Sequence, residues 1–381
     1  MPLKVMTIFG TRPEAVKMAP LVKELESRAE IDSICCITAQ HRQMLDDVLS
    51  LFAITPDYDL DIMEAGQSLY TITSKCLLGL EEVFSREKPD LVLVHGDTST
   101  TFAGALAAFY QKIAVGHVEA GLRTGFRYSP FPEEMNRTLV GDLAQYHFCP
   151  TPANRANLER EGIREGIFLT GNTVIDALKT TVRPDYHFRT DLLNHLDYTG
   201  RQVILVTCHR RENYGRPMEN IMRALRRIAE DFPQAELVYP VHLSPVVQTV
   251  AREHLSGHER IHLIDPLTPD EMHNLMARAS FVMTDSGGLQ EEAPALGRPV
   301  LVLRRETERP EAVTAGTVRL AGTEEEEIYA QAARLLTDPA AYEAMARAVN
   351  PYGDGFACRR IVDAILWKEG LSHRPPEEFS V

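Results

Sequence analysis

Residues 281–309 read FVMTDSGGLQEEAPALGRPVLVLRRETER and contain one complete strand, turn, helix and strand. Phe281 to Met283 is apolar and β-prone, whereas Leu289 to Leu296 has the apolar spacing of a helix. Gly287 to Gly288 forms the turn between them, and Pro299 to Leu303 resumes as a buried strand. This order predicts a parallel α/β unit.

The turn in this unit has the features of an anion site. Two glycines let the backbone approach a ligand closely, and the following helix presents N–H groups and the positive end of its dipole. Ser286 adds a hydroxyl, and the carboxylate of Glu292 is placed to accept two vicinal hydroxyls of a ribose. The alternative is an ordinary turn capped by Asp285 or Ser286, followed by a solvated pair of glutamates.

Length and charge limit the possible classes of protein. A chain of 381 residues predicts about two to three domains. Its 44% hydrophobic and 25% charged residues are typical of globular proteins. Because 54 acidic residues outnumber 40 basic ones, the formal charge of −14 argues against a nucleic-acid partner. A phosphate ligand would need a local basic cluster.

Targeting and redox signals point to the cytoplasm. The chain enters a predicted strand at Lys4 without a signal-peptide pattern, and no apolar run reaches the about 18 residues of a membrane helix. We therefore expect a cytoplasmic protein with no membrane partner. The six cysteines form no CxxC pair, so we expect reduced core residues and no structural zinc site.

Strands and helices alternate through the first half of the chain. The strand Lys4 to Phe9 ends in GlyThrArgPro at 10 to 13, which opens a helix. Arg12 in this turn faces the carboxyl edge of the predicted sheet, and Lys17 either does the same or is solvated. Further predicted strands are Ser33 to Ala39, Leu91 to His95 and Ile113 to Val118.

Three carboxylates follow these strands. Nearly continuous apolar strands indicate a parallel sheet with helices on both faces. Ligands of such sheets bind beyond the carboxyl ends of the strands. Asp97 and Glu119 lie at such ends, and Glu133 lies in the loop ArgTyrSerProPheProGluGlu.

The alternation restarts after a proline-containing segment at 148–172. The strand Val203 to Thr207 leads into His209, and Glu236 to Pro240 and Ile261 to Ile264 are further predicted strands. We predict an α/β fold with two domains, over residues 1–170 and 171–359, facing each other across a cleft. Asp354 to Lys368 is predicted to form a last helix, and the tail after Gly370 is expected to be loosely held.

The residues of these loops suit one kind of ligand. Cations (Arg12, Lys17, Arg309) and the glycine turn suit a diphosphate. Several carboxylates together suit proton transfer, provided that burial or mutual repulsion raises at least one pKa. A sugar nucleotide that undergoes acid–base chemistry fits both.

Eight ordered motifs extend this interpretation to nearly the full chain. The chain resembles the non-hydrolysing UDP-N-acetylglucosamine 2-epimerases in GlyThrArgProGluAla at 10–15, HisGlyAspThr at 95–98, HisValGluAlaGlyLeuArgThr at 117–124, ProPheProGluGlu at 130–134, HisArgArgGluAsn at 209–213, ThrAspSerGlyGlyLeuGlnGluGluAla at 284–293, GluArgProGlu at 308–311 and AsnProTyrGlyAspGly at 350–355.

The resemblance implies a fold, a reaction and partners. The family is similar in fold to GT-B glycosyltransferases. This resemblance implies a Rossmann-like domain over residues 1–170 and a Rossmann-like UDP-binding domain over 171–359. It also implies a C-terminal helix, at about 360–381, that packs back on the first domain. Its enzymes interconvert UDP-N-acetylglucosamine and UDP-N-acetylmannosamine by eliminating UDP to 2-acetamidoglucal and adding it back on inversion. The resemblance implies no redox cofactor, no metal and a homodimer. If UDP contacts residues of both domains, we expect it to draw them together.

The resemblance also assigns residues. It implies that Asp97, Glu119 and Glu133 are acid–base groups and that His209 lies beside the departing diphosphate. Arg12 and Lys17 would hold phosphate or the intermediate, and Arg309 would contact substrate. Ser286, Gly287 and Gly288 would hold the diphosphate, and Glu292 the ribose.

Each assignment has a structural alternative. Asp97 also fits a helix cap, Glu133 a loop-holding carboxylate, and His209 a satisfied structural histidine. His95 with Asp97, and His117 with Glu119, form His-x-carboxylate pairs, but no third histidine stands at ligand spacing.

Some members of the family carry an allosteric site for UDP-N-acetylglucosamine. The positions matching its pattern here are Gln40, Gln43, Glu133, Arg210 and His242. An arginine expected before Gln67 is replaced by Gly66, which removes a phosphate partner. Other functions to be tested are a hydrolysing 2-epimerase, a GT-B glycosyltransferase and a nucleotide-sugar-binding regulator.

Overall fold

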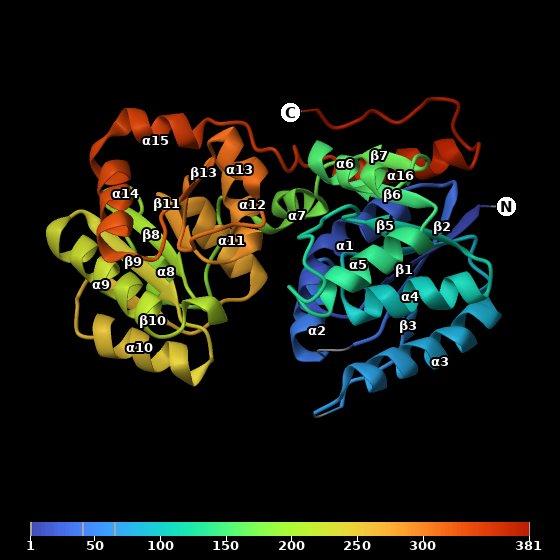
Figure 1. The fold of residues 1–381 in the computed structure, drawn as a ribbon, viewed down its shortest axis with the longest axis horizontal. Helices are drawn as coiled ribbons and strands as arrows, with labels where there is room; N and C mark the ends of the chain where they lie inside the picture. Colours follow the sequence, from blue (N-terminus) through green and yellow to red (C-terminus); the bar gives the residue numbers. More distant parts are fainter. Residues whose placement is uncertain (1, 40–41, 65, 381) are drawn as a thin grey trace. The chain divides into compact units, whose positions relative to one another are not determined.

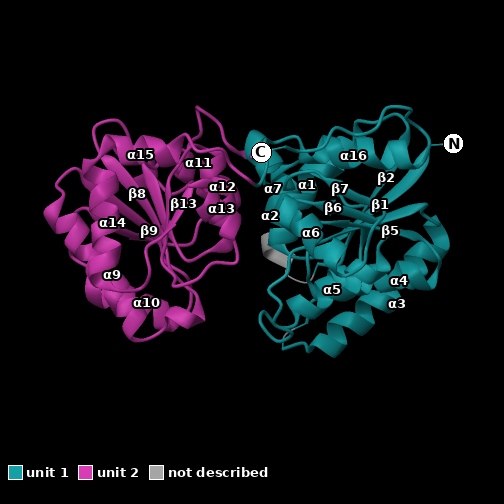
Figure 2. Ribbon diagram, turned by 45° about the horizontal axis from the view of Figure 1, so that its top comes forward, with its two compact units in different colours: residues 1–180, 352–380 teal, residues 181–351, 381 magenta. Residues whose placement is uncertain are grey.

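The computed structural model describes residues 2–39, 42–64 and 66–380 (Figure 1). The chain forms two compact units (Figure 2). The first comprises Met1–Thr180 and Tyr352–Ser380, and the second comprises Thr181–Pro351. Each unit has its own parallel sheet, which confirms the predicted fold class of two parallel α/β domains.

The first unit is built on a seven-stranded sheet in the order β3-β2-β1-β4-β5-β6-β7. All neighbouring strands pair in parallel. The strand order reverses between β1 and β4, and such a switch point is where ligands of open α/β sheets bind. The strands are β1 (Leu3–Phe9), β2 (Ile31–Ile37), β3 (Tyr58–Asp59), β4 (Leu91–His95), β5 (Ala114–Val118), β6 (Tyr146–Cys149) and β7 (Ile167–Leu169).

Helices cover this sheet because each buries an apolar face on it. One core cluster joins β1, β2, β4 and β5 to α3, α4 and α5, and α1 packs against α16 (Figure 1). Local caps set the helix starts, with Thr11, Thr98 and Thr151 accepting backbone N–H bonds. The helices are α1 (Arg12–Glu26), α2 (Arg42–Leu51), α3 (Leu69–Glu87), α4 (Ser99–Tyr110), α5 (Glu133–Leu143), α6 (Pro152–Arg160), α7 (Thr173–Thr181) and α16 (Ala357–Lys368).

The second unit has a six-stranded parallel sheet in the order β10-β9-β8-β11-β12-β13. Its order reverses between β8 and β11, which places a second switch point there. The strands are β8 (Gln202–Thr207), β9 (Ala235–Pro240), β10 (Ile261–Ile264), β11 (Phe281–Thr284), β12 (Val300–Val302) and β13 (Val318–Leu320).

One core cluster of the second unit joins its strands to α9, α10 and α14. The helices are α8 (Leu192–His195), the 3-10 turn η1 (Arg211–Asn213), α9 (Arg216–Asp231), α10 (Pro245–Leu255), α11 (Pro269–Arg278), α12 (Gly287–Ala295), α13 (Pro310–Ala315), α14 (Glu325–Thr337) and α15 (Pro339–Ala346). No helix in the described part of the chain is both long and apolar enough to span a membrane.

The units divide at Thr180 and Tyr352 rather than at the predicted residues 170 and 359. The reason lies in α7, whose Asp176 accepts hydrogen bonds from the backbone N–H groups of Ala357 (3.0 Å) and Cys358 (2.9 Å). Asp176 thus caps α16 from α7 and keeps both helices in the first unit.

The C-terminal segment agrees with the predictions only in part. The last helix ends at Lys368, as the sequence pattern predicted, and not at about residue 381, as the resemblance implied. The tail beyond Gly370 is not loosely held, because Phe379 is buried and its N–H donates to the carbonyl oxygen of Leu169 at 2.8 Å. A single aromatic side chain therefore anchors an otherwise exposed tail.

Candidate active site

Glu119 is the centre of a polar cluster in the first unit. It follows β5 with a backbone φ of +63°, a conformation that non-glycine residues rarely adopt. Its Oε2 is paired with the ammonium of Lys17 and accepts a hydrogen bond from Asn172 Nδ2 at 3.0 Å. His95 Nε2 lies 3.6 Å from the same oxygen. Lys17, predicted to hold phosphate, is thus engaged by a carboxylate.

Opposing effects act on the charge of Glu119. Its burial favours the neutral form, but the charges of Lys17 and His95 outweigh burial and hold the pKa of Glu119 well below its ordinary value. Glu119 is therefore a carboxylate at neutral pH and is able to accept a proton.

Asp97 follows β4, and its pKa is shifted in the opposite direction to that of Glu119. Burial raises the pKa of Asp97, Arg137 opposes that rise, and the charges of Glu119 and Glu133 add to it. Its carboxylate is paired with Arg137, and its backbone oxygen accepts a hydrogen bond from Asn136 Nδ2 at 2.9 Å. The alternative role as a cap of α4 is wrong, because the hydroxyl of Thr98 is the cap.

Glu133 begins α5 and interacts electrostatically with Asp97. Its Oε2 is buried and accepts no hydrogen bond from the residues that the structure describes. The neighbouring Glu134 holds the loop instead, since it accepts hydrogen bonds from the N–H groups of Thr124 (3.1 Å) and Gly125 (2.9 Å). Glu133 is thus left available for another partner.

Arg12 lies in the turn after β1, at the switch point of the sheet. Glu14 accepts hydrogen bonds from the N–H groups of Gly10 (3.1 Å) and Thr11 (2.8 Å) and from the hydroxyl of Thr98 (2.7 Å). It thereby joins the turns after β1 and β4. Burial lowers the pKa of Arg12 from its ordinary value, and the charge of Asp47 partly offsets this. A guanidinium group nevertheless stays a cation in proteins.

Replacing Lys17 with Met is expected to shift the pH dependence of turnover to higher pH. Without the ammonium, less opposes the effect of burial and the pKa of Glu119 rises, so that on lowering the pH the carboxylate is protonated at a higher pH. Lys17 also lowers the pKa of Asp97, so the basic limb moves the same way. The measurement is the profile of kcat against pH.

Lys23→Met is the matched control, because Lys23 lies on the same helix and its ammonium pairs at 2.9 Å with Glu26 on the exposed surface. An unshifted acid limb in Lys17→Met would show that Lys17 does not set the charge of Glu119.

The glycine turn of the second unit has a basic lining. Ser286 is at the N-cap position of α12, and its side chain makes no capping hydrogen bond. A Cβ built on Gly287 would lie 3.8 Å from Arg309 Nη2 and 3.9 Å from Arg210 Nη2. Two guanidinium groups therefore flank the N-terminus of a helix, which is an arrangement suited to an anion.

Asp285 holds the loop that carries His209. The carboxylate of Asp285 is fully buried, and its Oδ2 accepts hydrogen bonds from the N–H groups of His209 and Arg210, both at 2.8 Å, and from Asn213 Nδ2 at 3.1 Å. Its role is thus to fix this loop and not to cap α12. The ring of His209 stacks on that of His242, with centroids 5.2 Å apart and an interplanar angle of 14°.

The protonation of His209 follows from this environment. Burial lowers the pKa of His209, the charge of Asp285 opposes that change, and Arg210 adds to it. His209 is consequently neutral at pH 7.

The two glutamates of α12 are not the solvated pair of the alternative interpretation. Glu291 is buried and paired with Arg309. Glu292 Oε2 lies 3.3 Å from Nε2 of the buried His273, whose Nδ1 lies 2.8 Å from the hydroxyl of Thr181. Each carboxylate therefore has a defined orientation, and the second remains partly accessible at the turn.

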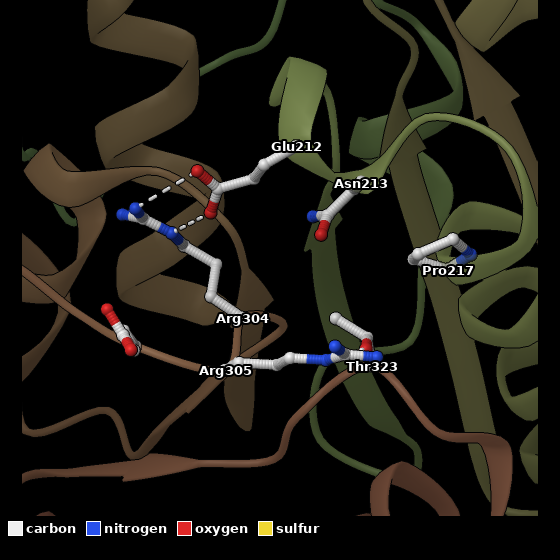
Figure 3. Close-up of a pocket in the computed structure, with 7 residues that line it drawn as sticks. Glu212, Asn213, Pro217, Arg304, Arg305 and Thr323 are labelled. Carbon is white, nitrogen blue, oxygen red and sulfur yellow. Dashed lines mark hydrogen bonds and ion pairs between the residues drawn. The ribbon is translucent and has the colours of Figure 1, made fainter. Parts of the chain in front are cut away.

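A separate cavity of about 330 Å³ lies beside the 209–213 loop (Figure 3). Glu212 pairs with Arg304 at 2.5 Å on one side of it, and Arg305 extends toward Thr323 on the other. The residues assigned to catalysis or to UDP do not line this cavity.

The predicted residues fall into two groups. The first unit contains one interacting group: Lys17, Asp97, Glu119 and Glu133. In the second unit, one set of residues gathers at the end of β8, namely His209, Arg210 and His242. Another set gathers at the end of β11, namely residues 286–292 and Arg309. Gln40 lies outside the described residues, and the side chain of Gln43 is not described. In the described ranges, no three His, Cys, Asp or Glu side chains are grouped to hold a metal ion.

Comparison with known proteins identifies the family. A family model described as UDP-N-acetylglucosamine 2-epimerase matches residues 23–366. The chain belongs to this family. It is 58% identical to the UDP-N-acetylglucosamine 2-epimerase of Bacillus subtilis over 99% of both chains.

Solved structures of family members agree with this assignment. The chain is 49% identical to the UDP-GlcNAc 2-epimerase of Neisseria meningitidis, solved with UDP-GlcNAc, with a TM-score of 0.88 over 96% of this chain and 100% of the other. It is 50% identical to MnaA of S. aureus, solved with UDP, with a TM-score of 0.90 over 99% and 100% of the two chains. The fold extends to the glycosyltransferase of kitacinnamycin, at 12% identity and a TM-score of 0.64, so fold alone does not decide between the two classes.

Four residues of this family member were missed by sequence reasoning as site residues: Asn172, His273, Asp285 and Glu291. Asp285 and Glu291 lie inside the ThrAspSerGlyGlyLeuGlnGluGluAla motif. Both side chains are buried, and the sequence did not show this burial. Asn172 follows β7 in a GlyAsn pair, as Asp97 follows β4 in a GlyAsp pair, so strand-end position was a usable signal. His273 lies within α11, and no signal in the sequence marked it as a site residue.

Proposed function

We propose that the protein interconverts UDP-N-acetylglucosamine and UDP-N-acetylmannosamine reversibly, without hydrolysis. Membership in the epimerase family supports the reaction class. Carbon 2 of the sugar bears the acetamido group and has no neighbouring carbonyl to acidify its hydrogen, so simple deprotonation would be slow. Elimination avoids this difficulty.

In the proposed reaction, a base removes the carbon 2 proton while the bond from carbon 1 to the UDP oxygen breaks. The electrons of the broken C–H bond form the double bond of 2-acetamidoglucal, and UDP carries away the electrons of the C–O bond. A proton then adds to carbon 2 on the opposite face, and UDP returns to carbon 1. Atoms and charge balance without a cofactor.

The observation that carries the proposal is the pair of neighbouring carboxylates with oppositely shifted pKa values. The pKa of Glu119 is lowered, so this group is ionised and has a site for a proton, whereas the pKa of Asp97 is raised, which favours its neutral, proton-donating form. Glu133, with its buried unbonded oxygen, is the third acid–base group. Inversion needs a base on one face and an acid on the other.

The second unit supplies the groups for UDP in this proposal. The N-terminus of α12 with Ser286 to Gly288, Arg210 and Arg309 would hold the diphosphate. Glu292, oriented by His273, would accept the ribose hydroxyls. Neutral His209 would donate to the departing diphosphate, and Arg12 would supply a further cation.

The deciding experiment is proton NMR of UDP-N-acetylglucosamine incubated with the protein in deuterated buffer. We expect loss of the carbon 2 proton signal, a new manno-type anomeric resonance and no accumulating UDP. The matched control is buffer without protein. Stoichiometric UDP with free N-acetylmannosamine would establish the hydrolysing reaction instead, and UDP binding without any exchange would leave glycosyl transfer or a binding role.

A further inference from the structure

The chain from Leu169, the last residue of β7, to Asn172 bonds to the C-terminal segment within the first unit. Glu378 accepts a hydrogen bond from the N–H of Leu169 at 3.4 Å, and the N–H of Phe379 donates to the Leu169 carbonyl. Arg360 Nη1 donates to the Thr170 carbonyl at 3.3 Å. The N–H of Asn172 donates to the carbonyl of Tyr352 at 2.6 Å. Three of the four residues 169–172 thus bond to residues 352–379.

Asn172 connects this segment to the acid–base cluster. Its Oδ1 accepts a hydrogen bond from the N–H of Val174 at 3.1 Å, which fixes the orientation of the amide. The other end, Nδ2, therefore faces Glu119 and donates to its Oε2 at 3.0 Å. The residue is only 3% exposed, so both ends of the amide lie inside the protein.

The buried ring of Phe379 packs near Asn172. Its ring belongs to a buried cluster with Ala120, Cys149, Leu158 and Leu169. Ala120 directly follows Glu119, and a Cβ built on Gly171, the residue before Asn172, would lie 3.7 Å from Phe379 Cγ. The ring thus packs against the segment that carries Asn172.

We propose that Asn172 is a positioning residue for Glu119 and that the C-terminal tail, through Phe379, holds Asn172 in place. This inference rests on the proposed role of Glu119 as an acid–base group. Glu119 has a strained left-handed backbone, which persists only where its surroundings hold it. Loss of the ring would leave a cavity into which residues 171–172 relax, so the amide would move away from the carboxylate.

The test is a double-mutant cycle in the full-length protein with Asn172→Ala and Phe379→Ala. Each single variant is expected to lower kcat about tenfold to a hundredfold, because displacements of about 1 Å at a reacting group have effects of this size. KM is expected to stay within about twofold, because neither variant removes a group assigned to UDP and most of those groups lie in the other unit. The double variant should equal Asn172→Ala alone, because the ring acts through the amide.

Two further variants separate positioning from general stability. Phe379→Leu restores most of the apolar volume and should recover most of the turnover, and Ser380→Ala, at the exposed neighbouring position, should leave it unchanged. Should Phe379→Ala not fold, Glu378→Gln replaces it in the cycle, since it loosens the tail through Leu169 and Arg155 without removing the buried ring.

A second readout does not depend on turnover. With 13C-labelled glutamate, the carboxyl resonance of Glu119, assigned with Glu119→Gln, should shift in Phe379→Ala but not between Asn172→Ala and the double variant. Multiplicative losses of kcat, or an unmoved resonance, would overturn the inference. Absence of epimerisation in the unmodified protein would overturn the proposed function alone, because the resonance still reports on the contact.

Discussion

Glu119→Gln is expected to lower kcat about a thousandfold, because a positioned acid–base group contributes about 10²–10⁴ in rate. The amide keeps the shape of the side chain and its neighbours Lys17 and Asn172, but it cannot accept the carbon 2 proton. Exchange of that proton with deuterium should fall by the same factor. The measurement is turnover and exchange followed in one NMR experiment, with the UDP affinity determined separately by calorimetry.

Glu82→Gln is the matched control, because Glu82 is an exposed carboxylate on α3 of the same unit. It should leave kcat and exchange unchanged. A Glu119→Gln protein that still exchanges the carbon 2 proton at the original rate would transfer the base role to Asp97 or Glu133. Unchanged UDP binding in Glu119→Gln would show that the effect is on chemistry and not on the folded state.

Arg210→Ala is expected to weaken UDP binding about 10–100-fold, the loss typical of one charge-assisted hydrogen bond. Arg210 is the cleaner probe of the glycine turn, because Arg309 is also the partner of the buried Glu291. Removing Arg309 would take an ion-pair partner from that buried carboxylate and destabilise the fold by about 3–5 kcal/mol. Calorimetry with UDP at two salt concentrations measures the effect.

Arg211→Ala is the matched control, because Arg211 is the next residue and its side chain is exposed. It should bind UDP normally. Normal UDP affinity in Arg210→Ala, combined with a changed response to added UDP-N-acetylglucosamine, would assign Arg210 to the allosteric site of the sequence prediction. The two results therefore distinguish a role of Arg210 in UDP binding from a role in the allosteric site.

Both residue groups lie at switch points of their sheets. In the first unit, the turns after β1 and β4 flank the reversal of strand order, and Glu14 ties them together. In the second unit, the loops after β8 and β11 flank the reversal of strand order, and Asp285 links these two loops. In each unit, a buried carboxylate that accepts backbone N–H bonds fixes two loops that contain predicted site residues.

The sequence by itself determined those features that depend on neighbouring residues. Alternating apolar strands and helices predicted two parallel α/β units, and the motif blocks predicted the family. The capping of α1 by Thr11 and the glycine turn before α12 are local as well, since residues within about four positions make them. Strand ends were therefore enough to select Asp97, Glu119 and His209 as candidates.

Only the tertiary structure decided which groups touch. Lys17 and Glu119 are 102 residues apart, Asn172 and Glu119 are 53 apart, and no periodicity links them. Burial, which shifts the pKa of Asp97 upward while ion pairing shifts that of Glu119 downward, depends on the packing of several strands at once. The anchored tail shows the same dependence, because Phe379 is buried only when β6 and β7 already stand beside it. Non-local strand order brings these groups together, and a linear sequence does not state that order.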